Sequence, residues 1–403
     1  HIIDSFTSSG NLTINITGKT GKGAAYGVFS FLEELGYYFL PERTLRPVTG
    51  RDTSVHKINK IYKTTNKWRG LFVSFCMVST SIMSLEDFSV LFDNMLRMKL
   101  NRIIFYPFEN EPLVDYEFQG ERKMVGDISR PESGYLSYGK HWTGSFDVDE
   151  IEVGREKFGS RKRVAPMEFQ DVSSSDEALN RGKEFLNNII IEAGKRQIGV
   201  WLSFLPQFVS MNMAKYLKPM PRKNLHWSAL VSCTDPVVKE INAARIRNIV
   251  ESYPDLEGVF VGIPEGFYED PYKESEEYIE SELPGYEKAL ELQKKYWGEH
   301  WPGDELQRKH IEADIAFSKV AIETLEELGK YNVRAGLLTV CKAYLLTKLH
   351  ELLPKDVSFC DIESRSLWTH GGAPLFLFKR MEGRECSIIP RITDDGSQAG
   401  MQF

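Results

Sequence analysis

The sequence has few cysteines and no spacing that pairs them. Its five cysteines form no Cys-x-x-Cys pattern, and an odd number cannot all pair within one chain. Most of them lie in or beside apolar, strand-like runs, where a free thiol behaves as a small buried hydrophobe. The pattern favours buried free thiols over a disulfide framework.

Long hydrophobic runs are also missing. No run approaches the roughly eighteen apolar residues that a membrane-spanning helix needs. The chain opens at His1 without the charged and apolar regions of a signal peptide. We therefore expect no membrane span, and we expect any signal peptide to have been removed.

Charge and motifs disfavour several classes of protein. The net charge is −7, and Lys and Arg are scattered, so no basic stripe predicts nucleic-acid binding. The glycine-rich turn at 18–23 lacks the spacing and the terminal Lys-Ser/Thr of a phosphate-binding P-loop. No Gly-x-Ser-x-Gly nucleophile elbow or dinucleotide-binding Gly-x-Gly-x-x-Gly follows a strand, which disfavours serine hydrolases and NAD enzymes.

Three histidines have aromatic neighbours but no metal-ligand spacing. They are His141, His300 and His370, and none belongs to a His-Glu-x-x-His or similar pattern. We therefore expect neither a metal ion nor a cofactor.

The 403 residues, 42% of them hydrophobic, are enough for one large core and a small appended domain. Residues 1–62 are predicted to form a small α+β domain. Residues 11–17 alternate apolar and polar positions like a half-buried strand, and a helix at about 24–35 ends before Gly36, a residue suited to a helix C-terminus.

From Trp68 onward, apolar strands alternate with amphipathic helices. This order predicts that residues 63–403 form a TIM-type (β/α)₈ barrel with a long insertion at about 112–172. No eighth strand is evident, so the barrel is expected to be incomplete toward the C-terminus. The seven strand candidates lie at 69–75, 101–107, 198–204, 257–263, 333–340, 357–363 and 386–391.

Several of these strands end in carboxylates. Glu265 follows an apolar run, and the carboxyl ends of barrel strands are where active sites lie. Asp361 and Glu363 are two residues apart on one strand, so both are predicted to face the barrel mouth while Ile362 faces the helices. A single carboxylate after a strand is more often a helix cap or a loop salt bridge. Two together suit hydrolysis of an acetal, which needs a carboxylic acid and a second carboxylate.

Two segments resemble known glycosidases. Residues 14–18 and 23–41 resemble the small α/β domain that precedes the barrel in family 20 hexosaminidases and family 67 α-glucuronidases. Residues 68–71 resemble the first barrel strand of family 20, which implies that Arg69 holds hydroxyls of the terminal sugar. Family 20 carries an Asp-Glu pair after its fourth strand, where this chain has Pro264-Glu265. Family 67 has its acid glutamate at that place and its base carboxylates on later strands.

The resulting hypothesis is a bacterial glycoside hydrolase, periplasmic or extracellular, that cleaves a complex poly- or oligosaccharide and is α-glucuronidase-like or hexosaminidase-like. Glu265 is predicted to be the general acid, with Asp361 or Glu363 as base or nucleophile. Other polar residues and flat aromatic rings, which serve as platforms for sugars, are predicted to bind the substrate. These residues are Arg69, Glu109, Asn110, His141, Trp142, Trp201, Trp301, Trp368, His370, Arg391, Asp394 and Asp395.

Three alternatives stay open. Trp201 lies in the middle of a strand and suits a core position as well as a binding position. The whole chain suits a non-catalytic glycan-binding protein on the same fold. A metal-dependent barrel hydrolase would need the three histidines to converge with acids.

Overall fold

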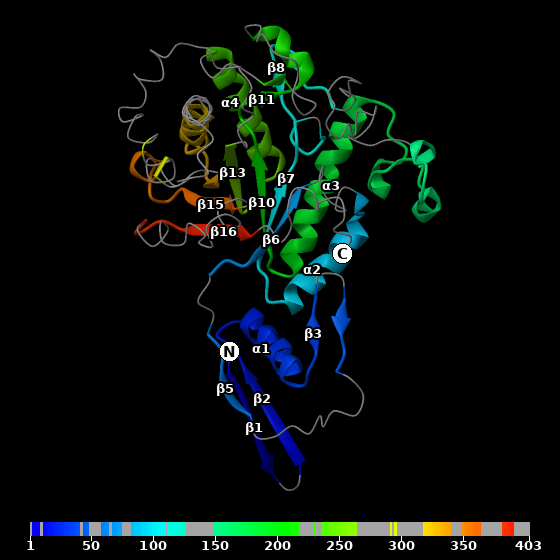
Figure 1. Ribbon diagram of the computed structural model, residues 1–403, viewed down its shortest axis with the longest axis vertical. Coiled ribbons are helices and arrows are strands. Elements are labelled where there is room, and N and C mark those ends of the chain that lie inside the picture. Colours follow the sequence, from blue (N-terminus) through cyan, green and yellow to red (C-terminus); the bar gives the residue numbers. More distant parts are fainter. Residues whose placement is uncertain are drawn as a thin grey trace.

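The structure, a computed structural model, has two units at opposite ends of its long axis, a small N-terminal lobe and a larger unit of sheet and helices (Figure 1). The residues that it describes are 2–8, 11–40, 43–47, 58–63, 67–74, 82–109, 111–125, 148–217, 229–230, 235–263, 291, 294–295, 317–339, 349–363 and 381–390.

The N-terminal lobe is a small sheet beside one helix. Strands β1 (Ile2–Ser8) and β2 (Asn11–Thr17) form an antiparallel hairpin, and β5 (Asn59–Ile61) pairs with the other edge of β1. A second short hairpin joins β3 (Tyr38–Phe39) and β4 (Thr44–Leu45). The strand predicted at 11–17 is confirmed, whereas β1 and β5 were not predicted.

Helix α1 (Gly21–Glu34) has clear signals at both ends. The Thr20 side chain accepts a hydrogen bond from the Gly23 N–H, so the helix begins three residues earlier than predicted. Gly36 follows the helix with a φ of 88°, a left-handed conformation that costs glycine little because it has no Cβ. The predicted helix C-terminus is confirmed.

The larger unit is built on a seven-stranded parallel sheet. Its strands lie in the sheet in the same order as in the chain, and every neighbouring pair is parallel. All seven predicted strands are confirmed, and no eighth strand joins this sheet in the described part of the chain. The strands are β6 (Gly70–Ser74), β7 (Arg102–Tyr106), β10 (Gly199–Phe204), β13 (Gly258–Ile263), β14 (Arg334–Thr339), β15 (Ser358–Glu363) and β16 (Cys386–Pro390).

Helices connect the strands, because parallel neighbours need long crossovers. They are α2 (Leu85–Arg97), α3 (Ser175–Lys195), α4 (Pro236–Ser252) and helical segments at 317–328 and 349–352. Ser84 and Asp87 form a capping box at the start of α2, and the Asp235 side chain caps α4. The periodicity of the sequence predicts helices at about 85–98, 176–196 and 236–251, and α2, α3 and α4 confirm them to within one residue at each end.

The loops after β7 and β10 carry short elements. Residues predicted as an insertion, 112–172, contain β8 (Glu117–Phe118), β9 (Glu121–Arg122) and the 3-10 helices η2 (Val148–Glu150), η3 (Arg155–Phe158) and η4 (Met167–Phe169) in their described part. After β10 come β11 (Phe208–Val209), η5 (Met211–Tyr216) and β12 (Ala229–Leu230).

The two faces of the sheet bury different clusters. Ile103 and Phe105 of β7 belong to the large core between the sheet and the helices, whereas Ile104 lies in a separate cluster on the opposite face. That second cluster also contains Trp201, Phe260, Leu338 and Cys360. A parallel sheet with helices on one face and a packed interior on the other is an incomplete (β/α)₈-type barrel.

Glycines make room for large rings in the barrel interior. A Cβ added at Gly258 would overlap the Trp201 ring, and one at Gly336 would overlap the Phe260 ring. Each ring lies directly opposite its glycine on the neighbouring strand. The Trp201 and Phe260 rings themselves lie 4.5 Å apart between centroids. The interior is therefore packed like the layered core of a barrel rather than left open.

Two sequence predictions concern the chain as a whole. Cys360 and Cys386 are free thiols, Cys360 buried and Cys386 partly exposed, while the other three cysteines lie outside the described residues. None of the helices in the described part has the length and apolar character that crossing a bilayer requires.

Candidate active site

The register of three neighbouring strands brings the predicted catalytic segments to one edge of the sheet. Ile263, the last residue of β13, pairs with Thr339 of β14, and Thr339 pairs with Asp361 of β15. Neighbouring strands lie about 4.8 Å apart, so the backbones at Ile263 and Asp361 are roughly 10 Å apart. Glu265 follows Ile263 by two residues. The carboxyl ends of β13 and β15 therefore border the same part of the barrel mouth.

Most of the predicted site residues lie outside the described part of the chain, and their placement stays a prediction. Asp361 and Glu363 belong to β15, so the structure gives their backbone position but not the direction of their side chains. Those outside the described residues are Asn110, His141, Trp142, Glu265, His300, Trp301, Trp368, His370, Arg391, Asp394 and Asp395.

The structure describes the side chains of β15 only as far as Cys360. Phe359 lies in the core between sheet and helices, and Cys360 lies in the interior cluster. Asp361 and Glu363 are two residues apart, so they belong to the same face of a regular strand. That they border the barrel mouth stays a prediction.

Trp201 is a core residue and not a sugar platform. Its side chain is fully buried, and the Arg102 guanidinium lies 4.4 Å from its ring centroid. It pairs with Ile104 and with Gly258, the first residue of β13, which places it toward the amino ends of the strands. The prediction that Trp201 binds substrate is therefore wrong, and the core position considered beside it is correct.

Arg69 lies at the opposite end of the sheet from the barrel mouth. It directly precedes β6, and its Nε donates a hydrogen bond of 2.8 Å to the carbonyl oxygen of Lys99. Its guanidinium lies 5.7 Å from the centroid of the Tyr26 ring on α1. A residue before a strand lies at the amino edge, so the predicted contact with substrate hydroxyls at the carboxyl edge is wrong.

Glu109 is held inside the protein. Its side chain is 5% exposed, accepts a 2.6 Å hydrogen bond from the Tyr116 hydroxyl and pairs with Arg245 at 3.2 Å. Arg245 also donates hydrogen bonds to the carbonyl oxygens of Leu205 and Phe208. These contacts tie the loop after β7 to α4 and to the loop after β10. The prediction that Glu109 binds substrate is therefore wrong, because its carboxylate is occupied by internal partners.

Glu111 and Lys123 complete this buried cluster. Lys123 Nζ donates hydrogen bonds to the carbonyl oxygens of Glu109 and Glu111, at 2.8 and 3.1 Å. The Glu111 carboxylate accepts a 2.7 Å hydrogen bond from the Phe108 N–H. Burial raises the pKa of Glu111 to about 8, against the lowering effects of that hydrogen bond and of Lys123. Glu111 is thus largely protonated at neutral pH.

Four charged residues close the amino end of the barrel, and none was predicted. Arg102 bridges Glu257 and Glu385, each at 3.2 Å, and Arg334 bridges the same two carboxylates at 2.8 and 3.0 Å. Burial alone would raise the pKa of Glu385, but Trp68 and the two guanidinium groups outweigh it, so this pKa lies below its ordinary value. In barrels this end contributes stability, not catalysis.

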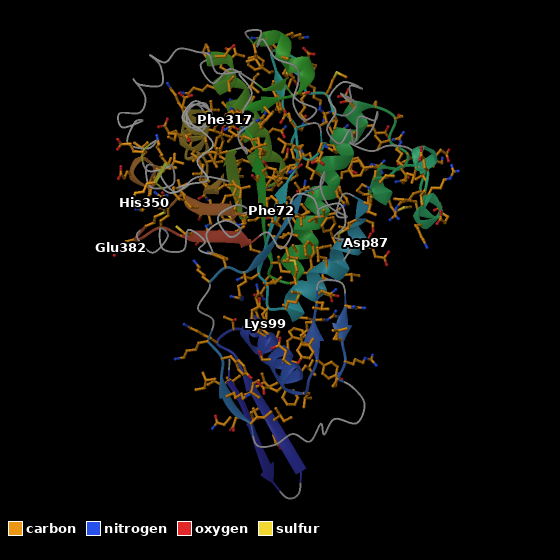
Figure 2. The ribbon with its side chains drawn as sticks, in the orientation of Figure 1. Phe72, Asp87, Lys99, Phe317, His350 and Glu382 are labelled. Carbon is orange, nitrogen blue, oxygen red and sulfur yellow. The ribbon has the colours of Figure 1, made fainter. Side chains whose placement is uncertain are left out.

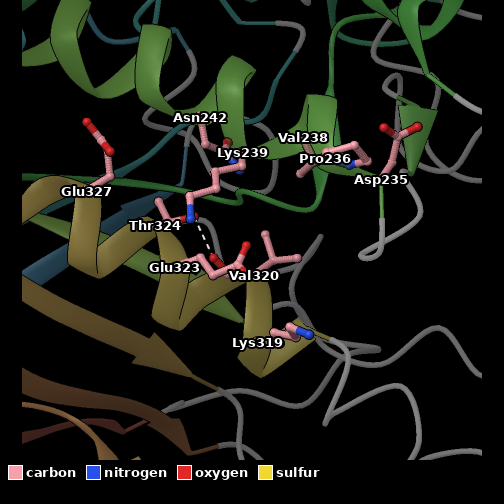
Figure 3. A pocket seen from close by; sticks show the side chains of 10 residues that line it. All are labelled: Asp235, Pro236, Val238, Lys239, Asn242, Lys319, Val320, Glu323, Thr324 and Glu327. Atoms are coloured by element: carbon pink, nitrogen blue, oxygen red, sulfur yellow. Dashed lines mark hydrogen bonds between the residues drawn. The ribbon is translucent and has the colours of Figure 1, made fainter. Parts of the chain in front are cut away.

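One cavity of about 310 Å³ lies between α4 and the helical segment at 317–328 (Figure 3). Lys239 and Asn242 line it from α4, and Lys319, Glu323 and Glu327 line it from the other helix. Because both helices lie outside the sheet, this cavity is separated from the barrel interior. In the described part of the chain, no group of three His, Cys, Asp or Glu side chains is arranged to hold a metal ion.

The sheet and its helices define the class of the larger unit as an incomplete (β/α)₈-type barrel, preceded by a small α+β lobe. No protein-family model matches the chain, and no curated protein matches its sequence.

Three solved structures with partial similarity to this chain are glycosidases. A glycoside hydrolase family 20 β-N-acetylglucosaminidase is 11% identical with a TM-score of 0.46, over 96% of this chain and 62% of that one. A family 20 β-N-acetylhexosaminidase from Streptomyces coelicolor A3(2) is 11% identical with a TM-score of 0.47, over 96% and 60%. A family 138 enzyme targeting pectin rhamnogalacturonan II is 13% identical with a TM-score of 0.40, over 96% and 40%. The chain therefore spans less than two thirds of each.

Proposed function

We propose that this protein is a glycoside hydrolase that cleaves a complex poly- or oligosaccharide with two carboxylates. The observation that carries the proposal is the register of β13, β14 and β15, which brings the ends of β13 and β15 to the same part of the barrel mouth. Glu265 follows one of these ends, and Asp361 and Glu363 belong to the other. The resemblance of residues 14–18 and 23–41 to glycosidases of families 20 and 67, and of residues 68–71 to family 20, supports the same class.

Glu265 is the general acid in this proposal. It donates a proton to the glycosidic oxygen as the bond to the leaving sugar breaks. The preceding strand is buried throughout, and an apolar neighbourhood raises the pKa of a carboxylic acid and keeps it protonated at neutral pH. Asp361 or Glu363 then attacks the anomeric carbon or activates a water molecule. A uronic-acid glycan is the favoured substrate class, because Pro264 stands where a family 20 enzyme has the aspartate that orients an acetamido group.

The test is a panel of uronic-acid and N-acetylhexosamine oligosaccharides, with product release followed by chromatography. Glu265→Gln is expected to lower turnover by at least about 10³-fold while binding persists, because the amide cannot give up a proton. Glu117→Gln, an exposed carboxylate on β8, serves as the matched control and should keep full activity. Near-normal turnover by Glu265→Gln would contradict the assignment.

The second carboxylate is identified by separate variants. Either Asp361→Asn or Glu363→Gln should abolish turnover, and the other should keep a measurable rate. The anomer of the first product, read by NMR, then gives the separation of the two carboxyl groups, since retention needs about 5–5.5 Å and inversion about 6.5–9.5 Å. If both variants stay active, the second carboxylate comes from another strand. A periplasmic or extracellular location belongs to the same proposal.

A further inference from the structure

Three aromatic rings lie close together on β6, on β7 and after β7: Phe72 in the middle of β6, Tyr106 at the end of β7 and Phe108 two residues beyond it. The Tyr106 ring centroid lies 5.4 Å from that of Phe72 and 5.6 Å from that of Phe108. All three side chains are partly exposed, whereas Trp201 and Phe260, on the neighbouring strands β10 and β13, are fully buried. Figure 2 labels Phe72 near the middle of the larger unit. In the described part of the chain, this group of partly exposed rings therefore lies on β6, on β7 and just after β7.

The alternation of β7 directs Tyr106 into the barrel. Ile103 and Phe105 belong to the core under the helices, while Ile104 lies in the interior cluster and Tyr106 packs against that cluster. Tyr106 is the last residue of its strand and pairs with Ser74, the last residue of β6. The aromatic surface thus lies at the mouth, where a barrel enzyme receives its substrate.

A polar group lies beside this surface. Leu202 of β10 pairs with Phe105 of β7, so the next residue, Ser203, is the cross-strand neighbour of Tyr106 on the interior face. The Ser203 side chain is fully buried, and among the described residues its hydroxyl has no hydrogen-bond partner. A buried hydroxyl without a partner is unfavourable, so a hydroxylated ligand or a bound water molecule that reached it would be favoured.

We propose that Phe72, Tyr106 and Phe108 form a subsite that stacks against the apolar face of one neutral pyranose ring. A pyranose has a face of C–H groups that packs on an aromatic ring and a rim of hydroxyls that need hydrogen bonds, which suits aromatic rings beside Tyr106 Oη and Ser203 Oγ. The nearby charges Glu109 and Lys123 are buried and bonded to internal partners. A neutral sugar therefore suits this aromatic surface better than a charged one.

The subsite lies across the mouth from the end of β15, to which Asp361 and Glu363 belong, and two strands away from β13, which Glu265 follows. β7 is separated from β15 by three strands, β10, β13 and β14. In a barrel of eight strands, positions four apart face each other. This inference rests on the proposed function, and it assigns the sugar bound here to a position next to the cleaved bond and not to the cleaved residue itself.

The test is binding of oligosaccharides to the Glu265→Gln protein, measured by isothermal titration calorimetry. The probes are the panel members hydrolysed by the unmodified protein, or the whole panel if none is hydrolysed. Tyr106→Ala should weaken binding at least about tenfold, which equals about 1.4 kcal/mol. Tyr106→Phe should stay within about threefold of the parent, because the ring face is kept. Tyr38→Ala, an exposed tyrosine on β3 in the other lobe, is the matched control and should bind normally.

Melting curves of every variant separate lost binding from lost folding, and Phe108→Ala serves as a second variant because its side chain lies outside the strands. Normal binding by folded Tyr106→Ala and Phe108→Ala would overturn the subsite. The subsite would also be overturned if Tyr106→Phe bound the oligosaccharide as weakly as Tyr106→Ala, since the hydroxyl and not the ring would then make the contact. Failure of all glycans to bind also overturns it. Binding that depends on Tyr106 without any turnover keeps the subsite and contradicts only the proposed hydrolysis.

Discussion

Gly336 shows how a single missing side chain shapes the barrel interior. The Phe260 ring occupies the space where a Cβ of residue 336 would lie. Gly336→Ala is therefore expected to lower the free energy of unfolding by about 1–3 kcal/mol, because extra volume in a packed core forces neighbours to shift. Urea unfolding followed by tryptophan fluorescence measures the change.

The matched control for this substitution is Gly194→Ala. Gly194 is exposed on α3, and nothing lies within 4 Å of an added Cβ. Alanine has the higher helix propensity, so this variant should be neutral or up to about 1 kcal/mol more stable. Equal effects of the two substitutions would contradict the packing argument.

Glu111 makes stability depend on pH. Its pKa is about 8 in the folded protein and about 4.5 in the unfolded chain, where burial no longer disfavours the carboxylate. Above pH 4.5 the unfolded chain releases this proton while the folded protein keeps it, so this group lowers stability progressively as the pH rises toward 8. Glu111→Gln should flatten this decline, measured by urea unfolding at several pH values from 5 to 8.

The neighbouring charges and an exposed glutamate serve as controls for that experiment. Lys123 and the Phe108 N–H both face Glu111, and both remain in the Glu111→Gln variant. Glu117→Gln, at the exposed position of β8, should keep the pH dependence of the unmodified protein. An unchanged slope in Glu111→Gln would show that other groups cause the decline.

Sequence alone could not reveal which distant residues bind the polar side chains predicted for the site. Glu109 follows a strand, as a substrate-binding carboxylate would, yet Arg245 that neutralises it lies 136 positions later in the numbering. Arg69 matches a family pattern in its local sequence but contacts α1 of the other lobe. Local sequence shows which groups are available, whereas their partners depend on the packing of distant elements.

At the scale of elements, ion pairs connect the amino ends of four strands. The residues that form these pairs are Arg102, Arg334, Glu257 and Glu385. Removing one carboxylate leaves the nearly buried Arg102, 4% exposed, with a missing partner. Because Glu385 itself is 24% exposed, solvent reduces the cost, and Glu385→Gln should lower the free energy of unfolding by about 1–3 kcal/mol. Chemical denaturation at low and high salt measures it.

A surface ion pair provides the comparison. Glu327 pairs with Lys330 three residues later, and its side chain is 15% exposed while that of the lysine is 66% exposed. Glu327→Gln should change stability by less than about 0.5 kcal/mol, since a single ion pair with an exposed lysine contributes little. If Glu385→Gln changed the free energy of unfolding equally little, the four charges would not stabilise the amino end of the barrel.

The positions of helices and strands were more predictable than the side of the sheet to which each side chain points. All seven barrel strands and the main helices follow from apolar runs, caps and periodicity, because these signals are local. The faces of the strands do not, since residues such as Leu202 and Ser203 lie in a run that is buried on both sides. The same property concealed Phe72, Tyr106 and Ser203, and only the strand register reveals them. The four charged residues at the amino end of the barrel gave a weak sequence signal, because each lies at or just before the first residue of a strand.

At the scale of the whole molecule, Tyr26 links the two lobes. It is 7% exposed, and its hydroxyl donates a 3.1 Å hydrogen bond to the Leu100 carbonyl oxygen in the barrel unit. Lys22 and Glu33 of the same helix bond to Gln197 and Lys99 of the barrel unit. Tyr26→Ala should lower the free energy of unfolding by about 2–4 kcal/mol through lost burial, measured by scanning calorimetry.

Tyr38→Ala removes the same side chain from an exposed site in the same lobe, where the tyrosine is 60% exposed. It should change stability by less than about 0.5 kcal/mol. If both variants behaved alike, the contact between α1 and the barrel unit would not stabilise the protein.

The barrel as a whole was predictable because alternating strands and helices allow few topologies. The mouth was predictable only in outline. The ends of β13 and β15 border the same region, as expected, but the residues after most strands belong to long connections whose sequence carries little periodicity. Chain order thus predicts where a site lies in a barrel more readily than which side chains form it.

The rings that lie opposite glycines in the interior also determine how the strands align. A parallel strand that slips by two residues keeps the same face inward, so alternation alone does not prevent this error. With such a slip, Phe260 would meet Arg334 or Leu338 in place of Gly336, where no space exists for its ring. We therefore expect positions 260 and 336 to vary together, so that a larger residue at one position is tolerated only with a smaller one at the other.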